Sequence, residues 1–382
     1  MRLLTETKAK LNWKDCCNLL VIRPDNIGDL LMSAPAFRAL KQFMKKGKIT
    51  LLTAQSTAVA ADLLPYIDET LVANLPWVKQ QDQLDPAEFS ALVSRLKHYR
   101  FDGCIIFTVY SQNPLPAAML AWMAGIPLRL AYCRENPYQL LTHWVPDEEP
   151  YSRIRHQVVR DLELVKSIGT DVSDDRIIIQ IPGSVKKSVT EKLIAAGVDV
   201  RRPLLILHAG VSEPRRAIPV DRWVALAKRI VASHNVQLLF TGQASERELT
   251  DRLQRSSGVD TFSMAGLLDV MEFAAVVQSV ALVISVNTAT IHLAAATGTP
   301  CVVFYAQTNP QHTPWRTPQR IFPFSVMSDD ISRNEVVRYV ARQLYRDRVP
   351  LPALEDVIDA VESLLVERAD CRLQLGGQLF FH

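Results

Sequence analysis

Short apolar runs rich in β-branched residues alternate along this chain with longer stretches in which apolar residues recur at helical spacing. The runs predict buried strands at residues 18–22, 49–52, 71–72, 103–107, 128–132, 177–181, 203–208, 236–240, 282–284 and 301–305. The main helices are expected at 30–43, 86–99, 116–123, 158–169, 184–196, 220–233, 270–279, 289–296, 334–345 and 352–367. Such alternation is typical of βαβ units, so the pattern predicts an α/β fold with doubly wound parallel sheets.

The chain divides into two halves of similar pattern. Its 382 residues are more than one core usually needs, and the polar stretch Thr170–Asp175 is a candidate linker. We therefore expect an N-terminal α/β domain at 1–170 and a C-terminal α/β domain at 171–331. A helical segment at 332–382 follows.

Composition narrows the class of protein. The net charge is 43 − 40 = +3, which gives no reason to expect a nucleic-acid partner. Six cysteines show no paired spacing, and neither a signal peptide nor a long apolar run is present, so we expect a cytoplasmic protein. The lysine-rich stretch 41–48 could contact an anionic membrane surface such as the inner membrane, although the favoured interpretation is a solvated helix end.

Four polar loops of the second half follow predicted strands and should meet at one edge of a parallel sheet. They are 209–216, 241–246, 285–289 and 306–310. Helix N-termini and the pair Arg215-Arg216 at that edge suit a diphosphate, although two arginines can equally be a surface pair. In the second loop, Glu246 could bind a ribose diol, while Ser245 and Glu248 could form a capping box for the next helix.

The first half places Asp29 directly after a strand and a turn, in the first turn of a helix. A carboxylate there is stabilised by the helix dipole, which is the reading that the residues alone favour. The alternative is a general base that takes a proton from an attacking hydroxyl group. The basic residues His143, Arg153, Arg155 and His156 near the end of this half could line an acceptor site or be solvated.

Several common site motifs are missing from the sequence. It has no G-x-G-x-x-G string, no P-loop, no D-x-D and no H-E-x-x-H. We therefore expect no resident cofactor and no metal site. A nucleotide diphosphate held by helix N-termini and arginine remains compatible with the pattern.

Three stretches resemble the signature regions of one known family. They are Arg23–Lys41 (RPDNIGDLLMSAPAFRALK), Leu207–Trp223 (LHAGVSEPRRAIPVDRW) and Ser285–Pro310 (SVNTATIHLAAATGTPCVVFYAQTNP). In this order they are similar to glycosyltransferase family 9, the ADP-heptose:lipopolysaccharide heptosyltransferases. The resemblance implies a GT-B architecture, in which two Rossmann-like domains face a cleft. It implies a nucleotide diphosphate sugar as donor, a lipopolysaccharide core or other glycolipid as acceptor, and metal-independent transfer with inversion.

The resemblance also implies roles for individual residues. Asp29 falls at the position of the catalytic base, which reverses the preference for a structural carboxylate, and Arg23, Asn26 and Gly28 lie beside it on the acceptor side. The donor-binding positions are Ser212, Arg216, Glu246, Leu267, Leu268, Asn287, Thr288, Ala289 and His292.

Departures from the family pattern lie on the donor side. Asn287 and Ala289 stand where the family has Asp and Gly, and Tyr305–Thr308 replaces F-G-P-T. These changes leave the nucleotide, the sugar and the acceptor open. They also keep two alternatives in view, which are a nucleotide-sugar epimerase of the same architecture and a non-catalytic nucleotide-sugar-binding protein.

Overall fold

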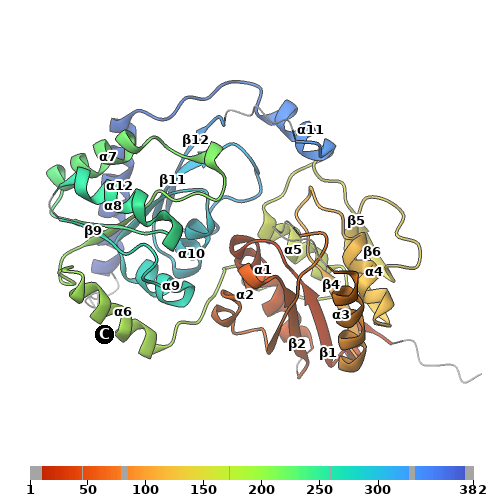
Figure 1. The fold of residues 1–382 in the computed structure, drawn as a ribbon. Coiled ribbons are helices and arrows are strands. Elements are labelled where there is room, and N and C mark those ends of the chain that lie inside the picture. The colour runs from red at the N-terminus through yellow and green to blue at the C-terminus, as the bar shows by residue number, and fades with distance from the viewer. Residues whose placement is uncertain are drawn as a thin grey trace, which may run out of the picture. The chain divides into compact units, whose positions relative to one another are not determined.

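The computed structural model describes residues 11–44, 46–78, 85–171, 173–258, 260–326 and 332–374. The chain forms two compact units (Figure 1). The first comprises Met1–Ala61 and Pro65–Asp175, and the second comprises Asp62–Leu64 and Arg176–His382.

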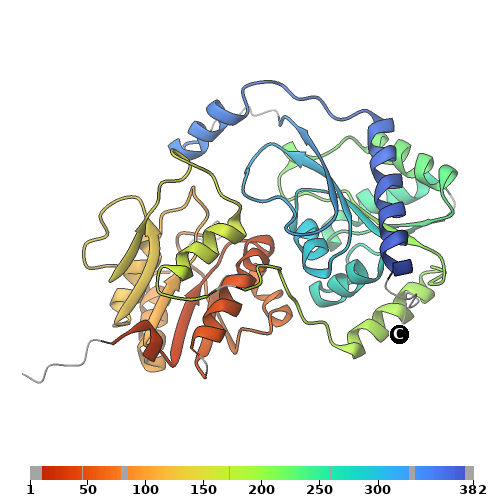
Figure 2. The same ribbon diagram turned by 180° about the vertical axis from the view of Figure 1, so that it is seen from behind.

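The first unit is built on a parallel six-stranded sheet in the order β3-β2-β1-β4-β5-β6. The strands are β1 (Asn18–Ile22), β2 (Lys48–Thr53), β3 (Glu69–Val72), β4 (Gly103–Ile106), β5 (Leu128–Cys133) and β6 (His143–Pro146). The helices are α1 (Ile27–Phe43), α2 (Gln55–Ala58), α3 (Pro86–Tyr99), α4 (Leu115–Met123) and α5 (Gln157–Lys166). One buried cluster joins Leu20 and Ile22 of β1 to α3 and α4, while α1 packs against α5 on the opposite face (Figure 2).

The second unit repeats this arrangement with the sheet order β12-β11-β10-β7-β8-β9. Its strands are β7 (Leu204–His208), β8 (Gln237–Phe240), β9 (Thr261–Ser263), β10 (Leu282–Val286), β11 (Cys301–Ala306) and β12 (Gln319–Phe324). The helices are α6 (Gly183–Ala195), α7 (Val220–Ser233), α8 (Arg247–Ser257), α9 (Val270–Ser279), α10 (Ala289–Thr297), α11 (Glu335–Leu344) and α12 (Leu354–Gln374). The buried ring of Trp223 on α7 meets Phe304 of β11 edge to face at 5.4 Å, and α12 packs on α7 beside them.

Both sheets reverse their strand order beside the first strand of the unit. In the first unit the chain goes from β1 outward to β3, then returns to β4 on the other side of β1. In the second unit β7 and β10 have the same relation. Since crossovers are right-handed, the connections on the two sides lie on opposite faces and leave a crevice at the carboxyl ends of the central strands. The segments after β1 and β10, which carry two of the three quoted motifs, begin at these points.

The predicted strand at 177–181 is wrong. Those residues form no strand, and their Gln180 N–H donates to the carbonyl of Leu63 at 2.8 Å. Their apolar, β-branched composition suits a strand, but the segment connects the two units and lies beside no strand that could complete a ladder.

Three strands were not predicted, namely β6, β9 and β12. Each lies at the edge of its sheet. Edge strands are half solvated and carry polar residues, so they lack the continuous apolar run that identifies a buried parallel strand.

The structure also bears on the lysine-rich stretch 41–48 and on the question of membrane-spanning helices. Of the lysine-rich stretch, Lys41 contacts Asp68 at 2.5 Å and Lys48 pairs with Glu69, while Lys45 lies outside the described residues. Among the described helices, none has the length and apolar character needed to cross a membrane.

Candidate active site

Arg23 is the first residue after β1 and is completely buried. Its backbone continues the ladder, with its N–H donating to Leu52 at 3.1 Å and its carbonyl accepting from the Thr53 hydroxyl at 2.8 Å. The guanidinium forms ion pairs with Asp25 at 3.2 Å and Asp29 at 3.6 Å. One buried cation therefore serves two carboxylates at the switch point of the first sheet.

Asp29 lies in the first turn of α1, which begins after the N-cap Asn26. The amide of Asn26 donates to Oδ2 of Asp29 at 3.2 Å, and the Asp29 side chain is 5% exposed. Gly28, between them in sequence, is buried. The three predicted acceptor-side residues and the predicted base thus share one edge, where the helix N-terminus and Arg23 both favour a negative carboxylate.

Asp161 reaches the same turn from α5. The Ser33 hydroxyl lies 2.6 Å from Oδ2 of Asp161 and 3.1 Å from the carbonyl of Asp29. The Ser33 hydroxyl donates to Asp161, and Gln157 of the same helix donates to the other oxygen of Asp161 at 2.7 Å. Burial raises the pKa of Asp161, and the charge of Arg23 and the hydrogen bonds from Ser33 and Gln157 oppose that rise.

Asp25 is the other partner of Arg23. Burial raises its pKa to about 6, the charge of Arg23 opposes that rise, and the nearby charge of Asp29 adds to it. Gln112 donates to Oδ1 of Asp25 at 2.5 Å. The amide oxygen of Gln112 accepts from Val109 N–H at 2.9 Å, which leaves the NH₂ group facing the carboxylate.

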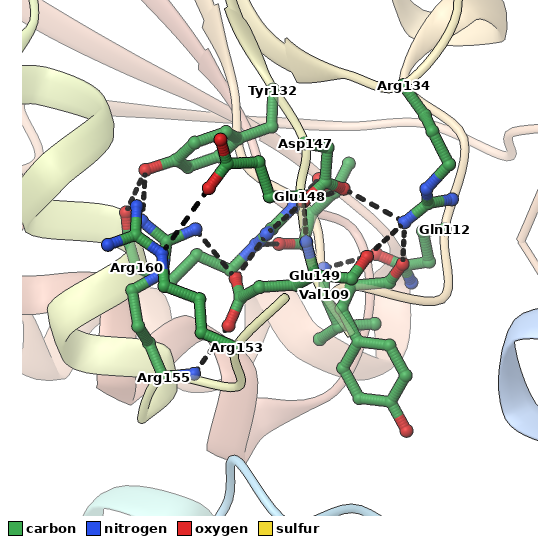
Figure 3. Close-up of polar contacts among 12 residues, drawn as sticks. Val109, Gln112, Tyr132, Arg134, Asp147, Glu148, Glu149, Arg153, Arg155 and Arg160 are labelled. Carbon is green, nitrogen blue, oxygen red and sulfur yellow. Dashed lines mark hydrogen bonds and ion pairs between the residues drawn. The ribbon is translucent and has the colours of Figure 1, made fainter. Parts of the chain in front are cut away.

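A buried ionic network continues along this edge (Figure 3). Arg160 of α5 is wholly buried and bonds to Asp147 at 2.7 Å and to Glu149 at 2.5 Å. Its guanidinium also lies 4.3 Å from the centre of the Tyr132 ring. Arg155 pairs with Glu149 at 2.9 Å, so one cation of the hypothesised acceptor group is already neutralised. These charges brace the loop after β6 against α5.

His156, another member of that hypothesised group, caps α5. Its ring nitrogen accepts from the Val158 N–H at 3.2 Å. Arg153 lies 3.8 Å from Glu148 and 3.9 Å from Glu163, with half of its side chain exposed. Among these residues, Arg153 is therefore the cation best placed to meet solvent.

In the second unit, the carboxylate of Glu246 lies against two glycines. A Cβ atom at Gly210 would lie 2.2 Å from Oε1 of Glu246, and one at Gly242 would lie 2.7 Å from Oε2. Oε2 accepts from Gln243 N–H at 2.7 Å, and the capping box of this turn joins Gln243 to Glu246. The predicted box of Ser245 and Glu248 is therefore wrong, because a short 3₁₀ turn precedes α8 and shifts the cap.

His208 ends β7 at the switch point of the second sheet. Burial lowers its pKa to about 4, so the ring is neutral at physiological pH. Its Nδ1 lies 3.0 Å from the Thr241 hydroxyl, and its ring lies 5.8 Å from that of Phe273. His208 thus presents a polar group here without a positive charge.

Ser212 and Arg216 follow β7 in the same loop. Ser212 is exposed, and the side chain of Arg216 is 20% exposed. Glu213 pairs with both Arg216 and Arg215, the latter at 2.7 Å. The two arginines thus share one acid, and the loop retains a net positive charge.

Asn287 follows β10 and binds the backbone of Ala306 at the end of β11. Its amide nitrogen donates to the Ala306 carbonyl at 3.1 Å, and its amide oxygen accepts from the Ala306 N–H at 3.0 Å. A carboxylate could make only the second of these bonds. The asparagine therefore fastens the ends of two neighbouring strands.

The remaining donor-side positions surround the start of α10 and the turn before α9. Thr288 is the N-cap of α10 and Ala289 its first residue, and the buried His292 meets the ring of His312 edge on at 6.2 Å. In the turn before α9, Leu267 is 50% exposed and Leu268 is half-buried. An exposed leucine beside a polar edge offers an apolar surface for a flat ring.

Comparison with known proteins places this geometry in a family. The family described as "Glycosyltransferase family 9 (heptosyltransferase)" matches residues 89–334. That span covers well over half of the chain. The chain belongs to glycosyltransferase family 9. It is a glycosyltransferase, and its two α/β units form the GT-B fold of this family.

Individual members of glycosyltransferase family 9 resemble the chain over most of its length. It is 26% identical over 299 residues to a Haemophilus influenzae protein named as a candidate glycosyltransferase, covering 75% of this chain and 82% of the relative. It is 22% identical over 305 residues to lipopolysaccharide heptosyltransferase 2 of Escherichia coli, covering 78% and 84%. A solved family 9 structure from Veillonella parvula superposes with a TM-score of 0.76 at 18% identity, covering 94% of this chain and 99% of that one.

The family match begins after the turn that holds Asp29, so the roles of individual residues remain predictions. The structure brings Arg23, Asn26, Gly28 and Asp29 together in the first unit and gathers the predicted donor set around the second sheet's edge. Sequence reasoning missed Asp25, Asp161 and His208. Asp25 lies within the quoted motif, whereas no local signal marks Asp161, which meets Ser33 from 128 residues away.

Proposed function

We propose that this glycosyltransferase is inverting and metal-independent and that it moves a heptose from ADP-heptose to a lipopolysaccharide core or related glycolipid. The observation that carries the proposal is the Asp29 carboxylate, buried in the first turn of α1 beside Arg23. The relative from E. coli is named a lipopolysaccharide heptosyltransferase, which supports the choice of sugar and acceptor. The proposal includes a cytoplasmic location and no resident cofactor.

In the proposed reaction, Asp29 takes the proton of an acceptor hydroxyl group as its oxygen attacks the anomeric carbon of the donor. The new glycosidic bond forms while the bond to the diphosphate oxygen breaks, and that electron pair leaves with the nucleoside diphosphate. Attack from the side opposite the leaving group inverts the anomeric centre. A buried carboxylate at a helix N-terminus suits this role because the helix dipole favours its negative form while burial shields it from water.

The second unit would hold the donor. Arg216, Ser212 and the N-terminus of α10 at Thr288 and Ala289 supply positive charge and hydrogen-bond donors for the diphosphate, in the role that a metal plays in other transferases. Among the described residues, no group of three His, Cys, Asp or Glu side chains is arranged to hold a metal ion. Glu246 would bind the ribose diol, and Leu267 and Leu268 would cover the base.

Replacing the base tests the proposal most directly. Asp29→Asn should lower turnover of ADP-heptose with a lipopolysaccharide core acceptor by about 10²-fold or more, the usual contribution of a general base. Binding of ADP, measured by calorimetry, should hardly change. Asp221→Asn is the matched control because Asp221 also lies in the first turn of a helix and has no proposed role in binding or transfer. Near-normal turnover by Asp29→Asn would show that the base is another group.

A nucleotide panel separates the alternatives. Calorimetry with ADP-, GDP- and UDP-sugars identifies the base, and mass spectrometry with and without acceptor identifies the reaction. Conversion of the donor alone would indicate an epimerase. Tight binding with no transfer to any acceptor would indicate a non-catalytic binding protein, the outcome that Asn287 and Ala289 in place of Asp and Gly would explain.

A further inference from the structure

The charges around Arg23 do more than hold Asp29 in place. Arg23 is completely buried and has carboxylates at 3.2 Å (Asp25) and 3.6 Å (Asp29). None of its three side-chain nitrogens makes a well-directed hydrogen bond to the described residues. Its positive charge therefore acts through space on both carboxylates, and also on Asp161.

Other charged groups lie near Arg23 but have partners of their own. The charge of Asp161 of α5 also acts on Arg23, and its two oxygens accept hydrogen bonds from Ser33 and Gln157. Arg160 of α5 is neutralised by Asp147 and Glu149. Gln112, from the segment after β4, is neutral, as is Asn26.

We propose that Asp25 is a positioning residue for Asp29: the two carboxylates compete for Arg23, and the charge on Asp25 keeps Asp29 a stronger base than Arg23 alone would leave it. This inference rests on the proposed role of Asp29 in transfer. Like charges in one site raise each other's proton affinity, whereas a nearby cation lowers it. A base beside an unshared arginine would be too weak to accept a hydroxyl proton efficiently.

The protonation of Asp25 then controls the site. The pKa of Asp25 is raised to about 6 by burial and by Asp29, against the pull of Arg23. Above that pH Asp25 is ionised and shares Arg23. Below that pH Asp25 is neutral, so the charge of Arg23 acts mainly on Asp29. Asp29 then becomes a weaker base, and the rate of transfer falls. The two carboxylates titrate as a coupled pair, so the effect is reciprocal.

Carboxyl-carbon NMR of the full-length protein labelled with ¹³C-aspartate tests the coupling without any substrate. We expect one aspartate, absent from the spectrum of Asp25→Asn, to titrate near pH 6. Asp29→Asn should lower that midpoint because a like charge is removed. Gln112→Met should raise it, because the N–H that stabilises the Asp25 carboxylate is lost while every charge remains. Asp221→Asn should leave it in place.

The inference is wrong if the Asp25 resonance titrates with an ordinary midpoint of ~4. It is also wrong if Asp29→Asn does not move that midpoint. Either result leaves the proposed function untouched. Conversely, a base assignment that fails in turnover assays leaves the measured coupling intact, so the two failures are distinguishable.

Kinetics with ADP-heptose and a lipopolysaccharide core acceptor give the second readout. Asp25→Asn should lower kcat about 3- to 10-fold at pH 8, as a weaker base predicts, and should remove the inflection near pH 6. Asp25→Glu retains the negative charge, so it should show the parent's kcat and the inflection near pH 6. A purely structural defect would lower kcat with the pH profile unchanged, and that result would also contradict the proposal. Thermal unfolding confirms that each variant is folded.

Discussion

The two units share one topology but differ in the chemistry at the edge where their central strands end. In the first unit this edge is crowded with buried charge, including Arg23, Asp25, Asp29 and Arg160. In the second unit the corresponding edge has two neutral groups, the Asn287 amide and the uncharged His208 ring, beside Glu246 and a loop in which Glu213 pairs with Arg215 and Arg216.

The difference shows how one scaffold serves two tasks. Proton abstraction needs a carboxylate whose basicity is controlled by neighbouring charges, so the first edge contains several of them. A diphosphate already carries negative charge, so an edge of N–H groups, hydroxyl groups and shared arginines suits it better. Identical strand order therefore determines where each site lies, and the side chains determine what it can do.

The largest expected effect is on the buried charge of the first unit. Arg160→Met would leave Asp147 and Glu149 without their shared buried cation, and we expect a loss of about 3–5 kcal/mol in the free energy of unfolding. Arg202→Met in the second unit, which breaks a partly exposed pair with Asp260, should cost far less. Urea denaturation followed by circular dichroism measures both. Equal losses of unfolding free energy in the two variants would contradict the contrast between buried charge in the first unit and exposed charge in the second.

Gly210→Ala tests the second edge. A Cβ atom there would displace the Glu246 carboxylate, which is the end of a flexible side chain, so stability should hardly change. The affinity for ADP should fall by about tenfold or more, equivalent to about 1.4 kcal/mol, because the proposed ribose contact is lost. Gly183→Ala is the control, since nothing lies within 4 Å of its added Cβ atom. Unchanged ADP affinity, measured by calorimetry, would remove Glu246 from the site.

Asn287→Asp would give the second edge the charge that the family pattern has there. The variant loses the donor to the Ala306 carbonyl and places a carboxylate against it, so we expect destabilisation by about 1–3 kcal/mol. Asn235→Asp is a surface control in which the oxygen that accepts from Arg202 is retained. If thermal unfolding shows Asn287→Asp to be as stable as the parent, the amide does not fasten the two strands.

The smallest expected effect is on how stability depends on pH. The sign of this dependence should be opposite for Asp25 in the first unit and His208 in the second. The pKa of Asp25 is raised to about 6, so its contribution to stability is present below pH ~4 and is lost as the pH rises through 6. The pKa of His208 is lowered to about 4, so its contribution is present above pH ~6.5 and is lost as the pH falls through 4.

Melting temperatures measured from pH 4 to pH 8 check both signs. Relative to the parent, Asp25→Asn should gain stability as the pH rises, whereas His208→Gln should gain it as the pH falls. If both variants gained stability in the same direction of pH, the two edges would not differ in the sign of their pH dependence.

Much of the fold could be predicted because it depends on local pattern. The central strands, from β1 and β2 to β10 and β11, are continuous apolar runs, and the helices between them show clear periodicity. The edge strands β6, β9 and β12 lack that signal, and the segment 177–181 has it without a neighbouring strand. Pairing partners, which local composition does not encode, explain these misses.

The candidate site divides in the same way. The sequence by itself determined that Asp29 follows a strand and opens a helix, and that small and polar residues follow the strands of the second half. Only the tertiary structure decided that Arg23 is shared by Asp25 and Asp29, that Asp161 accepts from Ser33, and that Asn287 binds Ala306. Secondary structure follows from the spacing of apolar residues along the chain. Ion pairs and proton affinities depend on burial and on groups that are distant in sequence, and folding alone brings these together.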